Sequence, residues 1–100
     1  MKNLAQLNAE FASKAIDPCI LFLLRSEDAL AYINRGQTLG LRLLGVEGFR
    51  ITKEGGFQPV QEWSNDIADY GGTDFVKDTF ALITTLVANE ATFQVVFEEN

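Results

Sequence analysis

The glycines of this chain are confined to its middle. All eight lie between Gly36 and Gly72, and neither the first 35 residues nor the last 28 contain one. Glycine adopts positive φ angles and weakens the interior of helices and strands. The distribution therefore predicts two regular, well-packed ends around a turn-rich middle, and a specific function is expected to use the unusual backbone of that middle.

The length and composition predict one globular domain over residues 1–100. A chain of 100 residues with 47% hydrophobic residues buries enough surface to fold alone and is not expected to be disordered. The longest apolar run, residues 19–24, is far shorter than the ~20 residues needed to cross a bilayer. Residues 1–16 are amphipathic and lack the continuous apolar core of a signal peptide, so no membrane partner is expected.

The missing histidine and the single cysteine remove most catalytic chemistry. With no histidine, Ser-His-Asp and Cys-His catalysis, histidine zinc sites and histidine pH switches are excluded. Cys19 lies inside an apolar run, where a buried and inert thiol is expected, and the reduced cytoplasm is the default compartment. The glycine spacing fits neither a dinucleotide fold nor a P-loop, and no EF-hand pattern occurs. We therefore expect no catalytic residue, no cofactor and no metal.

The net charge of −6 is unevenly distributed. Residues 1–50 carry six basic and five acidic side chains, a net charge of +1, whereas residues 51–100 carry two basic and nine acidic ones, a net charge of −7. An acidic half repels nucleic-acid phosphates and anionic membrane surfaces. The charge instead favours a partner with a basic surface.

Apolar residues recur at helical spacing in three segments, and capping residues mark a fourth helix. Long amphipathic helices are predicted at residues 2–16 and 74–89, and shorter helices at 26–35 and 60–70. The segment 26–35 begins with a capping serine and ends before a glycine, but its Tyr-Ile pair keeps a strand open as the alternative.

The remaining apolar segments are predicted strands of one sheet. Turns are expected at Glu47–Gly48 and at residues 54–56, and a three-residue loop at the second would place Phe57 on the face of the alternating apolar residues before it. Pro59 cannot donate to a ladder, so its strand is expected at an edge. The last strand, apolar on both faces, is expected to lie centrally. The predicted strands are residues 19–24, 39–46, 49–52, 57–60 and 93–97.

Strands grouped in the middle, with helices before and after them, favour an α+β fold. The expected architecture is a single layer of about four to five mostly antiparallel strands. The two long helices, 2–16 and 74–89, would pack on one face of it, together with one or two short helices.

The segment between the last two glycine-containing turns is the best candidate for a binding surface. It interleaves two aromatic residues with acidic ones, and protein interfaces favour aromatics while acidic surroundings steer a basic partner. The simpler interpretation is that the aromatics dock a helix on the core and the acids face water. The candidate partner-binding residues are Glu62, Trp63, Asp66, Asp69, Tyr70 and Asp74.

These observations favour a small, acidic, non-catalytic protein-binding domain. An inhibitor of a cationic enzyme, of the class of small bacterial immunity proteins or antitoxins, would suit the size, the charge and the missing histidine. One alternative is a structural or regulatory subunit that self-associates as a homodimer through the sheet edge near Pro59. A second alternative is a small-ligand-binding domain, or a carboxylate enzyme, with a pocket lined by the glycine-rich segment.

Overall fold

The protein has an α+β fold, as the sequence predicts. The computed structural model describes residues 3–16 and 22–98. Its four-stranded antiparallel sheet has the strand order β1-β4-β2-β3. The strands are β1 (Leu24–Arg25), β2 (Arg42–Ile51), β3 (Phe57–Asp66) and β4 (Thr92–Glu98). The helices are α1 (Asn3–Phe11), α2 (Ser26–Thr38) and α3 (Phe75–Thr85), with 3₁₀ turns η1 (Ile67–Asp69) and η2 (Val87–Asn89).

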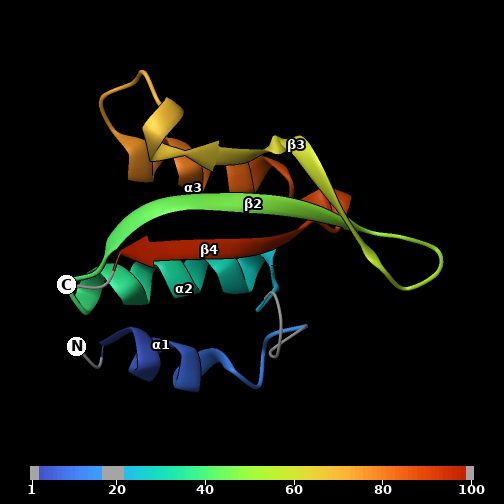
Figure 1. The fold of residues 1–100 in the computed structure, drawn as a ribbon, viewed down its shortest axis with the longest axis horizontal. Coiled ribbons are helices and arrows are strands. Elements are labelled where there is room, and N and C mark those ends of the chain that lie inside the picture. Colours follow the sequence, from blue (N-terminus) through green and yellow to red (C-terminus); the bar gives the residue numbers. More distant parts are fainter. Residues whose placement is uncertain (1–2, 17–21, 99–100) are drawn as a thin grey trace.

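The helical layer on the sheet consists of α2 and α3, which lie on the same side of it (Figure 1). The segment 26–35 is therefore a helix, as favoured. The sequence instead placed helix 2–16 on the sheet; α1 ends at Phe11 and packs mainly against α2, where Phe11 meets the Tyr32 ring edge-to-face at 5.3 Å between centroids. Because α2 begins directly after β1, it packs on the sheet next to β4. As a result, α1 packs on α2 and not on the sheet.

The core fills the space between the sheet and these helices. Phe93 of β4, Ile33 of α2 and Ile83 of α3 are fully buried. The backbone of α2 comes very close to β4, because a Cβ at Gly36 would lie 2.3 Å from the Phe97 ring. Glycine at this helical position serves a close approach rather than the helix stop that the sequence suggested.

The structure corrects the prediction of two strands joined by a turn at Glu47–Gly48. Residues 42–51 form one strand, β2, which continues through this pair. Its partner β4 is an interior strand, as expected for the C-terminal segment. Gly48 is needed for another reason: a Cβ there would lie 2.4 Å from the Cβ of Trp63. The Glu47–Gly48 pair therefore lies where β2 and β3 approach closely, and the chain does not turn there.

The second predicted turn is confirmed. Gly55 has φ +84°, its N–H donates to Thr52 O at 3.0 Å, and the Thr52 N–H donates to Gly56 O at 2.8 Å. This is a three-residue hairpin loop with glycine in the left-handed position. It pairs Phe57 with Ile51 as expected, and β3, which contains Pro59, lies at the edge of the sheet.

The predicted helix over residues 60–70 is wrong. Most of this segment belongs to β3, and only η1 is helical. Its apolar residues match a helical repeat, but pairing with β2 satisfies the backbone and overrides that local pattern. Of the predicted strand 19–24, the structure shows β1 at its end, while Cys19 lies outside the described residues.

Candidate functional site

The pairing of β3 with β2 contains a large bulge. Val46 pairs with Asn65, but Gly48, two residues further along β2, pairs with Val60. Residues 61–64 of β3 therefore lie opposite the single residue Glu47. A β-bulge bends its strand and redirects the side chains around it, so this irregularity is the main distortion of the two-stranded β2–β3 unit.

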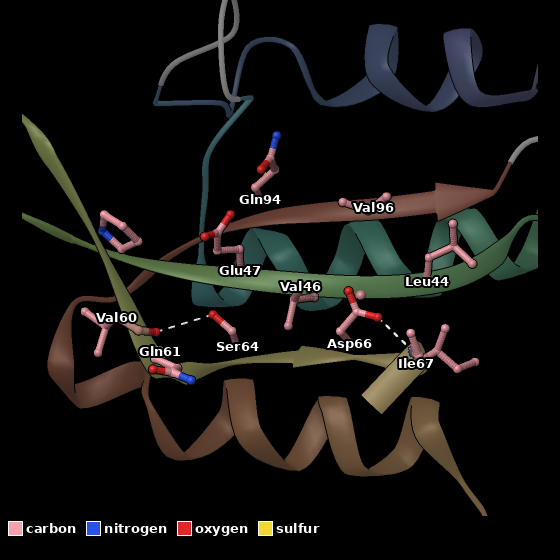
Figure 2. Close-up of a pocket in the computed structure, with 13 residues that line it drawn as sticks. Leu44, Val46, Glu47, Val60, Gln61, Ser64, Asp66, Ile67, Gln94 and Val96 are labelled. Atoms are coloured by element: carbon pink, nitrogen blue, oxygen red, sulfur yellow. Dashed lines mark hydrogen bonds between the residues drawn. The ribbon is translucent and has the colours of Figure 1, made fainter. Parts of the chain in front are cut away.

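Ser64 holds the bulge in place. Its hydroxyl accepts a hydrogen bond from the Gly48 N–H at 3.3 Å. It donates one to the Val60 carbonyl, also at 3.3 Å (Figure 2). The two strands approach closely here because Gly48 has no side chain. The Ser64 hydroxyl thus links β2 to β3 across the bulge, and the missing side chain of Gly48 leaves room for Trp63.

A groove of about 790 Å³ runs beside the bulge, and its lining residues come from β2, β3, β4 and the turn η1 (Figure 2). Side chains alternate between the two faces of a sheet. Since Phe93, Val95 and Phe97 belong to or pack against the core, Gln94 and Val96 point to the other face. Val96 is 44% exposed although β4 is an interior strand. The apolar floor of the groove is therefore open to solvent.

The groove carries negative charge. Glu47 on β2 and Asp66 at the end of β3 both line it and are both exposed. Arg42, a cation on the same sheet face, is already paired with Glu98 at 3.3 Å. A positively charged group entering the groove would meet two carboxylates beside an apolar floor.

The aromatic residues of the predicted site face the core side. Trp63 and Tyr70 are half-buried and pack against the core cluster, and the Arg50 guanidinium lies 5.5 Å from the Trp63 ring centre. Glu62 and Asp69 are exposed. The acidic residues of this segment thus face solvent and its aromatic residues pack against the core. This is the simpler interpretation of the sequence, in which the aromatics dock on the core and the acids face water.

Two of the predicted acidic residues, Asp66 and Asp74, also serve as N-caps of helical segments. Asp66 accepts the Ala68 N–H at 2.8 Å at the start of η1, and Asp74 accepts the Lys77 N–H at 3.1 Å as the cap of α3. The Tyr70 hydroxyl donates to the carboxylate of Asp78, and this hydrogen bond raises the pKa of Tyr70. Of the six predicted residues, only Asp66 lines the groove. Whether the six bind a partner stays a prediction.

Glu47, Ser64 and Val96 line the groove although the sequence does not predict them as site residues. Glu47 was assigned to a turn, and no local signal distinguishes Ser64 from an ordinary surface serine. Val96 did give a signal, because an apolar residue on the second face of a strand needs either a covering layer or a partner. That signal was used only to place the strand centrally.

A second hollow, of about 670 Å³, lies at the N-terminal end of α2. Its lining mixes Arg25 and Arg50 with Glu27, Asp28 and Glu90. Charges of both signs alternate around it, so it selects neither an anion nor a cation.

Within residues 3–16 and 22–98, no group of three or more metal-ligating side chains is placed to hold a metal ion. None of the helices in this part of the chain is long and apolar enough to span a bilayer. Comparisons with protein-family models, with curated proteins and with solved structures found no significant match.

Proposed function

We propose that this protein is a non-catalytic binding domain that engages a basic protein partner through the groove beside the β3 bulge. The observation that carries the proposal is the combination of a solvent-exposed apolar floor at Val96 with the carboxylates of Glu47 and Asp66. An apolar centre supplies binding energy, and the acidic surroundings attract and orient a cationic surface. The overall charge of −6 acts in the same direction.

Within this proposal, an inhibitor of a cationic enzyme is the class we favour, and the reduced cytoplasm is the proposed compartment. Such an inhibitor needs a rigid surface rather than reactive groups. The groove largely meets that requirement, because most of its lining residues belong to three neighbouring strands and only Ile67 and Ala68 to the turn η1. Recognition elements on strands hold their geometry more precisely than those on loops.

The two alternatives fit the groove less well. Self-association through the sheet edge near Pro59 would leave the groove unused. A second copy docked on the groove instead would bring two copies of the carboxylates of Glu47 and Asp66 into one interface, where like charges are destabilising. A small molecule would be comparable in size to the groove, but such ligands bury about 70–90% of their surface. Val96 on the floor of the groove is 44% exposed, and we take this site to be too open to bury a small ligand to that extent.

The proposal is tested by capturing partners at low salt and then measuring association with the purified candidate. Glu47→Lys should lower the association rate constant about tenfold or more at low salt. Glu54→Lys in the hairpin loop makes the same change in net charge outside the groove and is the matched control. If both variants slow association equally, or neither does, the groove is not the binding surface. If no basic protein is captured, the proposed function is wrong.

A further inference from the structure

We infer that the element of the partner that occupies the groove is an amphipathic α-helix, with apolar residues along one face and Lys or Arg beside them. This inference rests on the proposed function and names the binding mode of the same groove. It follows from three features of the sheet: the state of its two edges, the openness of its floor, and the position of the acidic side chains.

The edge formed by β3 is unsuited to adding a partner strand. The Thr52 N–H donates to Gly56 O, and hydrogen-bonded and non-hydrogen-bonded pairs alternate from there along the hairpin. The pair Phe49–Pro59 is then non-hydrogen-bonded, so the Pro59 nitrogen points outward, where proline offers no donor. Residues 61–64 follow directly and form the bulge. Proline and bulges are two devices that block edge pairing.

The opposite edge offers even less. In the part of the chain that the structure describes, this edge is formed by β1, which consists of Leu24 and Arg25 and continues into α2 at Ser26. These two residues offer a pairing strand little backbone to bind. Both edges therefore disfavour strand addition, and the open face remains as the docking surface.

A segment that lies on a sheet face cannot use the sheet's backbone for hydrogen bonds. An extended peptide on the floor formed by Leu44 and Val96 would leave its own N–H and C=O groups against apolar side chains, which is unfavourable. A helix satisfies its backbone internally and exposes only side chains. A helix laid on a sheet is also how α2 and α3 cover the other face.

The position of the carboxylates specifies the charge of this helix. Glu47 lies on β2, directly opposite Gln94 of β4, and Asp66 lies at the end of β3 (Figure 2). A helix with apolar residues at i, i+3 or i+4, and i+7 could cover Leu44 and Val96 and present a Lys or Arg to Glu47.

The experiment is a selection of random peptides of about 16 residues, roughly four helical turns, displayed against the immobilised full chain. The enriched peptides are expected to carry a positive charge, to repeat apolar residues with helical spacing, and to gain helical circular dichroism on binding. Glu47→Lys and the double change Leu44→Gln with Val96→Thr should each weaken them about tenfold. Glu54→Lys should leave their affinity within about twofold. Circular dichroism of each variant checks its folding.

The outcomes separate the inference from the proposed function. Basic peptides that alternate apolar and polar residues, gain no helicity and ignore the Leu44 and Val96 changes would overturn the helix inference and leave a basic partner standing. Enriched peptides without positive charge, or an affinity that Glu47→Lys does not change, would overturn the proposed function as well. The absence of any enriched peptide would overturn both.

Discussion

The two faces of the sheet are built from the same strands but for different purposes. On the helix side, Phe93 is fully buried beneath a layer of helices, while its neighbours on the other face of β4 include the half-exposed Val96. Burial of apolar area stabilises a fold by roughly 25 cal/mol per Å², so the helix side carries most of the stability. The open face keeps apolar area and carboxylates in solvent, where they are available for binding.

The largest expected effect separates the faces directly. Phe93→Ala removes a fully buried ring and should lower the free energy of unfolding by about 3–5 kcal/mol, because the cavity cannot be filled by its packed neighbours. Urea denaturation followed by circular dichroism measures this loss. A loss below about 1 kcal/mol would mean that this side of the sheet is not the stabilising one.

The close approach at the bulge should be the next most sensitive point. In Gly48→Ala the new Cβ would lie 2.4 Å from the Trp63 Cβ and 2.6 Å from the Trp63 carbonyl oxygen, so one strand must move. Such overpacking costs about 1–3 kcal/mol, measured in the same denaturation assay. Gly71→Ala is the control, because no heavy atom lies within 4 Å of a Cβ there. Equal effects of the two changes would contradict the crowded bulge.

The hydroxyl of Ser64 should contribute less than the glycine. Ser64→Ala leaves the Gly48 N–H and the Val60 carbonyl without this partner, and a loss of about 1 kcal/mol is expected. Amide hydrogen exchange should become faster at Gly48 but not in the hairpin loop near Gly55. Unchanged exchange at Gly48 would show that the bulge does not depend on this serine.

The attachment of α1 to α2 should depend weakly on pH, unlike the apolar core behind the sheet. Hydrogen bonds from Arg35, and secondly from Gln6, hold the pKa of Glu10 near 2, against its ordinary 4.5. The folded-state pKa is lowered, so the contribution is present above about pH 4.5 and is lost as the pH falls towards 2. Glu10→Gln should therefore lower the melting temperature slightly at neutral pH, and this difference should vanish near pH 2. A difference that is independent of pH would contradict the ion pair.

The smallest expected change in stability is on the open face. Val96→Thr keeps the β-branched shape at a position that is 44% exposed, and the free energy of unfolding should change by less than about 0.5 kcal/mol. The contrast with Phe93→Ala is the sharpest test of the comparison between the faces. A loss of more than about 1.5 kcal/mol would mean that Val96 is part of the core.

Predictions of helices and strands from the spacing of apolar residues were correct where one face of the element is buried, because burial then requires either the helical or the strand repeat. The amphipathic patterns before Phe11 and after Asp74 and the capping residues of the segment 26–35 all marked helices, and the glycine turn at residues 54–56 formed as predicted. They failed between residues 60 and 66, where an interrupted strand has a spacing that mimics a helix. The groove could not be predicted, because most of its residues come from β2, β3 and β4, which meet only through strand pairing.

The α+β class, the hairpin turn at Gly55 and the unequal distribution of charge can be predicted from the sequence alone, because they depend on local pattern and composition. The roles of Gly36 and Gly48, by contrast, depend on the folded arrangement of the chain. Gly36 and Gly48 lie where backbone and aromatic side chains approach too closely for a Cβ, a property of distant segments brought together. The middle of the chain is unusual, as its glycines predicted, but the reason is a bulged sheet with an open acidic face.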